Sequence, residues 1–462
     1  MRDILKLKLI FGFILILLSA CDDDGEPTVE PIAAFSFNIT NEGILPTTVN
    51  FTSTSQNAAS YQWSFGDGGT SDLQNSEHTY TESGTFQVSL TVENGSLSDT
   101  ETKSVIIAAE AETTSIPQVD DVINTFMATY NVPGLSVAIT KGEALVYAKS
   151  YGMADTDNNI EVSNNSLFRI ASVSKPITSV AIFKLIEEGK LSIDQKVFGD
   201  GSILGTDYGS TPYSSGITDI TLSQLLHHTA GGWGNSANDP MFSNQEMSQA
   251  ELISWVLDNR PLDYQPGVHY DYSNFGYCVL GRVIEKVTGE TYETWVKENV
   301  LEPAGIYGME IAGNTLEDQK ENEVVYYGQS GQNPYIYNIV RMDAHGGWIS
   351  NATDLARFLV HVDNYNSIPD ILETSSINNM TTASSAYANY ACGWGVNSAN
   401  NWWHVGSLPG TATEIVRASN GYNWVVLCNT RSANSAFINE LDGLIWKAVT
   451  DATTAWPNVD LF

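Results

Sequence analysis

The sequence predicts a multidomain protein in which an all-β module precedes a larger α/β domain. The chain has 462 residues, which is more than a single hydrophobic core usually serves. Residues 32–108 alternate apolar and polar side chains between turn-rich pieces, a pattern typical of half-buried strands. From residue 117 onward, stretches of helical period alternate with short strand-like runs, which favours an α/β architecture.

Residues 1–20 have the features of a signal peptide. Basic side chains flank an apolar run over residues 9–18, which is too short to span a bilayer. Leu18-Ser19-Ala20-Cys21 resembles the lipobox of bacterial lipoproteins, which implies that Cys21 becomes the lipidated first residue of the mature chain. We therefore expect an exported protein, anchored by lipid to the bacterial cell envelope on the periplasmic face or the cell surface. A plain secretory signal cleaved nearby is the alternative.

Acidic side chains dominate the charge of the chain. It carries 54 Asp and Glu against 21 Lys and Arg, a formal net charge of -33. Because such a surface repels nucleic acid and anionic membranes, nucleic acid is not an expected partner. Residues 21–31 are acidic and contain proline, so we expect them to form a linker.

Three cysteines remain beyond the expected lipidation site: Cys278, Cys392 and Cys428. An odd number without the spacing of metal ligands predicts neither a metal site nor a disulfide framework. One bridge and three buried free thiols both fit this spacing. No His-Glu-x-x-His motif is present either, so no metal and no cofactor are expected.

The first module carries a recognisable set of motifs. Tyr61-Gln-Trp-Ser-Phe-Gly-Asp-Gly-Gly69, His78-Thr-Tyr80 and residues 84–90 together resemble a PKD domain over nearly the whole module. The resemblance implies an immunoglobulin-like sandwich with Trp63 in its core. Gly66-Asp67-Gly68 is expected to form a tight turn, where glycine permits positive φ. PKD modules serve as spacers or as surface adaptors that contact carbohydrate or protein, and both roles stay open.

A polar linker over residues 109–116 leads into the second domain, which we place at residues 117–455. Residues 119–130 have apolar side chains at helical spacing and predict an amphipathic helix. Residues 135–140 and 144–149 then flank Lys141-Gly-Glu143, a sequence typical of a β-hairpin.

Ser172 and Lys175 form the only Ser-x-x-Lys in the chain. We expect a helix from Ser172 to Glu188, ended by Gly189. Residues three apart on a helix share a face, so the Lys175 amine can reach the Ser172 hydroxyl and hold or remove its proton.

Two further elements carry groups suited to the same chemistry. Tyr272-Ser273-Asn274 precedes an apolar helical stretch; a tyrosine with a lowered pKa can act as a base, and an asparagine amide can orient a substrate carbonyl. His404-Val405-Gly406 is predicted to be an edge strand whose glycine lets substrate approach the backbone. A second Tyr-x-Asn at Tyr387 to Asn389 shows that this motif alone is weak.

The order Ser-x-x-Lys, Tyr-x-Asn, His-x-Gly resembles the serine β-lactamase and penicillin-binding-protein superfamily, specifically its class C β-lactamase-like branch. Two further segments agree with it, residues 225–231 (Leu-Leu-His-His-Thr-Ala-Gly) and residues 346–358. The resemblance covers roughly residues 117–450. It implies a β-lactamase/DD-peptidase-type domain, with an antiparallel sheet flanked by helices and a separate helical region.

The resemblance also implies roles for single residues. Ser172 matches the acylated nucleophile, and Lys175 matches the amine that activates it. Tyr272 matches the base, and Asn274 matches a contact to the substrate amide. Backbone N–H groups of Ser172 and Ser407 would form the oxyanion hole.

The third motif departs from the family. β-Lactamases and transpeptidases usually present Lys followed by a hydroxyl residue to the substrate carboxylate, whereas this chain has His404 and Val405. Imidazole is mostly neutral at pH 7 and valine offers no hydrogen bond, so carboxylate recognition should weaken. His228 is expected to brace a loop, whereas His345 either lines the cleft or is structural.

We therefore interpret the chain as a lipid-anchored serine hydrolase that resembles esterases and D-aminopeptidases. Its substrate would be a small molecule or peptide with an ester or amide bond. A cell-wall DD-carboxypeptidase or a weak class C β-lactamase is the alternative enzyme. A non-catalytic cell-surface binding protein is the alternative from another class.

Overall fold

The computed structural model describes residues 29–39, 47–107 and 115–462. The expected signal peptide, Cys21 and most of both linkers lie outside the described residues. Within those residues, no helix is long and apolar enough to cross a membrane.

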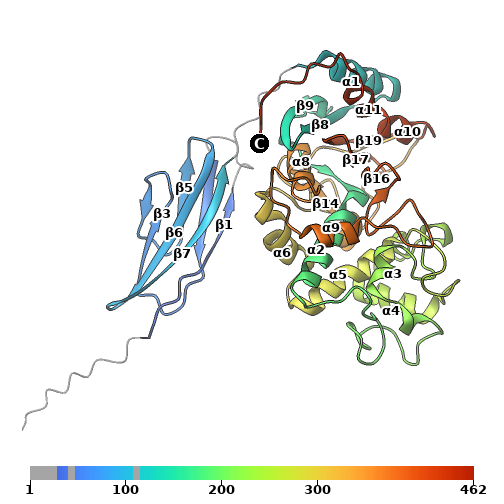
Figure 1. Cartoon of the computed structure of the whole chain (residues 1–462), viewed down its shortest axis with the longest axis horizontal. Coiled ribbons are helices and arrows are strands. Elements are labelled where there is room, and N and C mark those ends of the chain that lie inside the picture. The colour runs from blue at the N-terminus through green and yellow to red at the C-terminus, as the bar shows by residue number, and fades with distance from the viewer. Residues whose placement is uncertain (1–28, 40–46, 108–114) are drawn as a thin grey trace, which may run out of the picture. The chain divides into compact units, whose positions relative to one another are not determined.

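The N-terminal module is a sandwich of two sheets (Figure 1). One sheet has the order β1-β2-β5, and the other has the order β4-β3-β6-β7. The strand bounds are β1 Phe35–Ile39, β2 Thr47–Ser53, β3 Ser60–Ser64, β4 Thr70–Ser71, β5 Ser76–Tyr80, β6 Gly84–Asn94 and β7 Leu97–Ile107. The expected immunoglobulin-like architecture of a PKD domain is thereby confirmed.

Aromatic side chains fill the core of this sandwich. Trp63 is fully buried, with ring centroids 5.0 Å from Phe35 and 5.4 Å from Phe51. Its indole N–H donates to the Leu73 carbonyl at 2.8 Å. The expected turn is present, because Gly66 and Gly68 have φ of 83° and 100°, a region that favours glycine.

The second domain is built on a seven-stranded antiparallel sheet of order β10-β9-β8-β18-β17-β16-β15. The strand bounds are β8 Gly134–Lys141, β9 Ala144–Asp155, β10 Ile160–Glu161, β15 Gly395–Val396, β16 Trp402–Leu408, β17 Thr411–Arg417 and β18 Tyr422–Cys428. Smaller sheets join β11 Phe168–Arg169, β14 Trp348–Ser350 and β12 Glu310–Ile311, and β13 Tyr327–Gly328 with β19 Thr430–Arg431. The predicted hairpin corresponds to β8 and β9, and its turn places Gly142 at φ 58°.

Helices cover both faces of this sheet, because both faces of its central strands are apolar. On β8, Val137 and Ile139 face a core with helices α1 Pro117–Tyr130, α10 Phe437–Asp442 and α11 Leu444–Val449. Ala138 faces the opposite core, which contains helices α2 Ser174–Glu187 and α8 Ala352–Val360. The predicted amphipathic helix over residues 119–130 is α1.

A helical region packs beside the sheet, with α3, α4 and α5 grouped together (Figure 1). The helices are α3 Leu222–Leu226, α4 Gln249–Asn259, α5 Asn274–Thr288, α6 Tyr292–Val296, α7 Asp343–Gly346 and α9 Thr374–Met380. Helix α2 is buried on nearly all sides, including its polar residues Lys175, Thr178 and Ser179. The helix expected from Ser172 differs at its start: Ser172 lies in a 3₁₀ turn, Ala171–Val173, and the α-helix begins at Ser174.

Candidate active site

The turn that carries Ser172 is pressed against the sheet. The hydroxyl of Thr413 on β17 donates to the Ile170 carbonyl at 2.8 Å. A Cβ on Gly406 of β16 would overlap that same carbonyl oxygen. Gly406 is therefore needed for the strand to approach the nucleophile turn, whereas the sequence predicted that it admits substrate to the backbone. Ala171 adopts φ of 47°, a region that non-glycine residues rarely occupy.

Lys175 lies on the first turn of α2 with its amine completely buried. Its Nζ donates to Asn274 Oδ1 at 2.7 Å and to the His345 carbonyl at 2.9 Å, and it lies 3.0 Å from the Ser172 hydroxyl. Burial lowers the pKa of Lys175 well below its ordinary value, while the charge of Asp239 acts in the opposite direction. A neutral amine at this position has a lone pair that can take the serine proton.

Asn274 is the first residue of α5, and both the oxygen and the nitrogen of its side-chain amide form hydrogen bonds within the protein. Its Oδ1 accepts from Lys175, and its Nδ2 donates to Asp239 Oδ2 at 2.6 Å. These two bonds position Lys175, and the substrate contact expected for Asn274 stays a prediction. Asp239 was not predicted, since it belongs to no motif and its only local signal is an Asp-Pro step before the short helix η5 Pro240–Phe242.

Tyr272 completes the group around the Lys175 amine. The amine lies 4.8 Å from the centroid of the Tyr272 ring. Burial raises the pKa of the Tyr272 phenol above its ordinary value, and a hydrogen bond with Ser172 acts in the opposite direction. The sequence predicted a lowered pKa for this tyrosine, and that direction is wrong. The phenol is neutral at pH 7, and Lys175 is the residue whose pKa is lowered.

The strand β16 forms one wall of the cleft. Its partner β15 pairs only with Trp402 and Trp403, so the outer edge from His404 onward bears no further strand among the described residues. The predicted edge strand at His404-Val405-Gly406 is thus confirmed. Ser407 and Ser172 line the same cavity, as an oxyanion pair requires.

His404 is buried and neutral. Its Nε2 accepts from the Tyr390 hydroxyl at 3.0 Å, and its Nδ1 lies 2.7 Å from the Val405 carbonyl. Burial, together with the nearby charge of Lys175, lowers the pKa of His404 to about 3. The neutral imidazole expected from the sequence therefore has a structural cause.

The cleft has a volume of about 390 Å³, and none of its lining side chains is charged. Those side chains are Ser172, Asn235, Tyr270, Tyr272, Tyr387, Asn389, Tyr390, Gly395, Trp403, His404, Val405 and Ser407. Sequence reasoning missed most of the aromatic wall. The second Tyr-x-Asn, to which the sequence analysis gave no role, supplies Tyr387 and Asn389 to this cavity. The Tyr387 ring stacks on that of Tyr270, with the two centroids 4.3 Å apart.

A second cation, Arg431 on β19, contacts the cleft strand: its Nη1 donates to the Ser407 hydroxyl at 3.3 Å. It is not among the residues that line the cavity. His345 is also absent from the lining; its backbone carbonyl, rather than its ring, holds Lys175.

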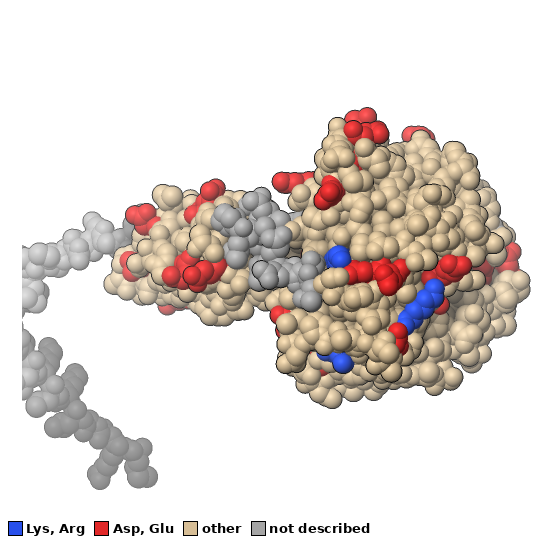
Figure 2. All heavy atoms as spheres, turned by 90° about the horizontal axis from the view of Figure 1, so that it is seen from above, with Lys and Arg blue, Asp and Glu red and all other residues tan. Residues whose placement is uncertain are grey.

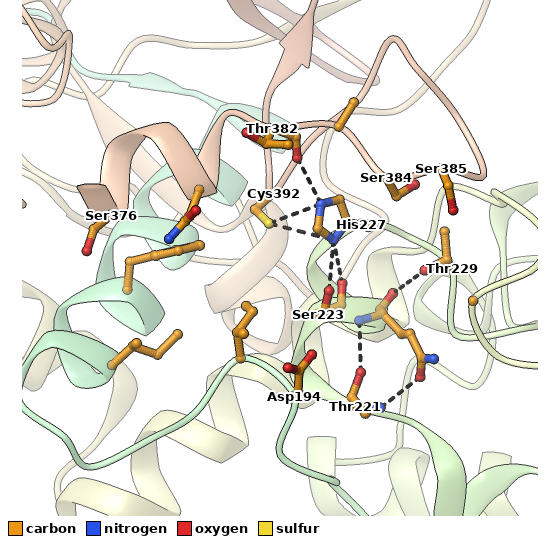
Figure 3. Close-up of a pocket in the computed structure, with 17 residues that line it drawn as sticks. Asp194, Thr221, Ser223, His227, Thr229, Ser376, Thr382, Ser384, Ser385 and Cys392 are labelled. Atoms are coloured by element: carbon orange, nitrogen blue, oxygen red, sulfur yellow. Dashed lines mark hydrogen bonds between the residues drawn. The ribbon is translucent and has the colours of Figure 1, made fainter. Parts of the chain in front are cut away.

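A larger cavity of about 610 Å³ lies between α2, α3 and α9 (Figure 3). His227 reaches into it and lies 3.5 Å from the sulfur of Cys392. Both ring nitrogens of His227 also lie close to backbone carbonyls, those of Ser223 and Thr382. Ser172 and its partners do not line this space, so it is separate from the candidate active site. Cys278, Cys392 and Cys428 are all free and buried, the second of the two arrangements expected.

Comparisons with known proteins agree with the fold of both domains. A family model described as beta-lactamase matches residues 119–444, and one described as PKD domain matches residues 26–108. Protein flp of Staphylococcus aureus (strain MRSA252) is 25% identical over 327 residues, 68% of this chain and 63% of its own length. The chain thus spans less than two thirds of that relative. A putative D-alanyl-D-alanine carboxypeptidase of Escherichia coli O157:H7 is 26% identical over 303 residues, 57% of this chain and 68% of its own.

Solved structures share the architecture. An octameric penicillin-binding protein homologue from Pyrococcus abyssi has a TM-score of 0.57 at 25% identity, covering 71% of this chain and 77% of its own. A class C beta-lactamase reaches 0.61 at 20% identity over 73% and 96%. The D-amino acid amidase from Ochrobactrum anthropi SV3 reaches 0.60 at 19% identity over 72% and 97%. The last two likenesses show the fold alone.

Proposed function

Because the chain belongs to the Beta-lactamase family, we propose that it is a serine hydrolase that cleaves an ester or amide through an acyl-enzyme on Ser172. The observation that carries this proposal is the buried Lys175 amine, 3.0 Å from the Ser172 hydroxyl. Burial favours the neutral amine, which is the form that can accept a proton from serine.

In the proposed acylation, Lys175 takes the Ser172 proton as the serine oxygen bonds to the substrate carbonyl carbon. The carbonyl oxygen becomes negative and is stabilised by the backbone N–H groups of Ser172 and Ser407. When the intermediate collapses, the bond to the alcohol or amine breaks, and the leaving group receives the proton from Lys175 through the neutral Tyr272 phenol. Water then attacks the acyl carbon and gives one proton to the same groups; the bond from that carbon to Ser172 Oγ breaks, Oγ takes this proton back, and the acid is released.

The uncharged cleft favours substrates that carry no charge beside the scissile bond. None of its lining residues is charged, and His404 is neutral with its Nε2 already bonded to Tyr390. These features favour an activity like that of esterases and D-amino acid amidases or D-aminopeptidases over β-lactam hydrolysis. A DD-carboxypeptidase or weak β-lactamase remains the second candidate, favoured by the similarity to the putative carboxypeptidase and by Arg431 next to Ser407.

We also propose that the enzyme is exported and lipid-anchored through Cys21. The PKD module would then hold the hydrolase away from the membrane or contact carbohydrate or protein. Acidic side chains are prominent on the face shown in Figure 2, in keeping with the net charge of -33, and this charge disfavours nucleic acid as a partner.

A fluorophosphonate probe tests the catalytic proposal directly. The wild-type protein should form one covalent adduct, and Ser172→Ala should form none. Ser174→Ala changes a buried serine two residues away; it is the matched control and should keep the adduct. Absence of a Ser172-dependent adduct would favour the non-catalytic binding protein. Hydrolysis of nitrophenyl esters should also exceed that of the cephalosporin nitrocefin, and equal rates would favour the β-lactamase alternative.

A further inference from the structure

A chain of hydrogen bonds joins the loop that carries Tyr272 to the strand that carries Ser407. The Ser273 N–H donates to His228 Nδ1 at 3.1 Å. His228 Nε2 lies 3.2 Å from the Tyr390 hydroxyl, and that hydroxyl lies 3.0 Å from His404 Nε2. The chain ends at the Val405 carbonyl, 2.7 Å from His404 Nδ1.

The direction of every proton in this chain is determined by its two ends, the Ser273 N–H and the Val405 carbonyl, because the carbonyl can only accept and so requires the His404 proton on Nδ1. A backbone N–H can only donate, so His228 Nδ1 accepts and the proton of the neutral ring is on Nε2. His228 therefore donates to the Tyr390 oxygen, and the Tyr390 proton is given to His404 Nε2. His404 is left with its own proton on Nδ1, where the Val405 carbonyl accepts it.

The surroundings keep both imidazoles uncharged. His228 is 1% exposed, Tyr390 7% and His404 5%. Burial disfavours protonation of both rings, and the nearby Lys175 amine acts in the same direction whenever it carries a proton. The other titratable neighbours are the phenols of Tyr270, Tyr272 and Tyr277, together with His227 and Cys392.

From this geometry we propose that Tyr390 is a specificity-determining and positioning residue of the active site. Its hydroxyl fixes the loop that carries Tyr272 relative to strand β16, which carries Ser407. It also keeps His404 neutral, with Nε2 occupied as a hydrogen-bond acceptor. A substrate carboxylate at this position would find neither a cation nor a free donor. The site therefore selects esters or amides whose leaving group is uncharged there, an inference that rests on the proposed hydrolase function.

The same geometry explains why His404 suits this cleft better than lysine would. A lysine ammonium has three donors and no acceptor, so it would leave the Tyr390 proton without a partner in a buried site. Leaving a buried donor unsatisfied is costly. The histidine and the tyrosine are thus complementary, although 14 residues separate them in the sequence.

A matched pair of substrates tests the selectivity: a phenyl ester of an N-acylglycine, and the same ester with a 3-carboxylate on its phenyl leaving group. Wild type should prefer the neutral ester by at least about tenfold in kcat/KM, the size expected from about 1.4 kcal/mol. In Tyr390→Phe the ratio of the two kcat/KM values should be smaller than in wild type. His404 Nε2 then has no protein partner, so it can take a proton and pair with the bound carboxylate as imidazolium. The change should therefore be largest at pH 5, the lowest value in the range from 5 to 8. Tyr387→Phe removes a hydroxyl from the same wall outside the chain and should change both substrates alike.

Nitrogen-15 NMR of histidine-labelled protein provides a readout that does not depend on turnover. His228 should appear as the neutral Nε2–H tautomer and His404 as the neutral Nδ1–H tautomer at pH 6, with signals assigned by His228→Asn and His404→Asn. In Tyr390→Phe the His404 signal should change while fluorophosphonate labelling of Ser172 persists.

The two proposals fail in different ways. If wild type forms no Ser172 adduct, the hydrolase function is wrong. If labelling occurs but the substrate preference of Tyr390→Phe equals that of wild type at every pH, the role of Tyr390 is overturned. The opposite tautomer at either histidine would overturn it as well.

Discussion

The Lys175 amine donates to Asn274 Oδ1 at 2.7 Å, although 99 residues separate them in the sequence. This bond, with those to Ser172 and to the His345 carbonyl, fixes the amine at the junction of α2, α5 and α7. Because Nζ is completely buried, its position and its protonation state are both set by its neighbours.

Lys175→Met should abolish acylation without unfolding the protein. Methionine has a similar length and no amine to desolvate, which offsets part of the cost of leaving Asn274 Oδ1 and the His345 carbonyl without this donor; the domain should stay folded with a stability loss of about 1–3 kcal/mol. The acylation rate should fall by at least about 100-fold, since general acid–base catalysis typically contributes that much. Burst kinetics with a nitrophenyl ester and thermal unfolding measure the two quantities, and a retained burst would exclude Lys175 as the base.

The stability of the hydrolase domain should rise with pH through the same residue. Lys175 has a lowered pKa when folded and an ordinary one, 10.5, when unfolded. Between these two values the unfolded chain binds more protons, so the free energy of unfolding increases with pH, by up to about 1.4 kcal/mol per pH unit. Below the folded pKa both states are protonated and the contribution is constant.

Urea unfolding at several pH values between 6 and 9 checks this prediction. The difference in unfolding free energy between wild type and Lys175→Met should increase with pH. Parallel pH profiles for the two proteins would show that Lys175 is protonated in the fold.

Asp239→Asn should shift the pH dependence of hydrolysis. The Asp239 charge favours protonated Lys175, so its removal should lower the Lys175 pKa further and move the acid limb of kcat/KM to lower pH. One hydrogen bond to Asn274 or Met241 is lost as well, at a cost of about 1 kcal/mol of stability. Asp219→Asn, which removes an exposed partner of Lys196, is the control and should leave the profile unchanged.

Gly406→Ala should displace the turn that carries the nucleophile. The added methyl group would overlap the Ile170 carbonyl and the Thr413 hydroxyl, and overpacking of this kind typically costs about 1–3 kcal/mol. Thermal stability and fluorophosphonate labelling should both fall. Gly443→Ala, whose added methyl group meets only ordinary contacts, should change neither, and full labelling in Gly406→Ala would contradict the close approach.

Local motifs made part of the site predictable. Ser172 and Lys175 are one helical turn apart, so their contact follows from helix geometry wherever the helix lies. Asp239 and Tyr390 were not predictable, because each acts on a residue far along the chain and neither belongs to a motif. The direction of the Tyr272 pKa shift was also wrong, since burial is a property of the assembled fold.

The sequence alone determined the two-domain order and the pairing of Ser172 with Lys175, because these depend on periodicity and short spacing, and its motifs indicated the PKD and β-lactamase-type folds. It also indicated that the His-x-Gly strand lacks the family's usual cation. Only the tertiary structure decided the proton arrangement. The orientation of the hydrogen bonds from Ser273 to Val405, and the lowered pKa values of Lys175 and His404, arise from buried groups that meet across distant segments and must satisfy one another's hydrogen bonds.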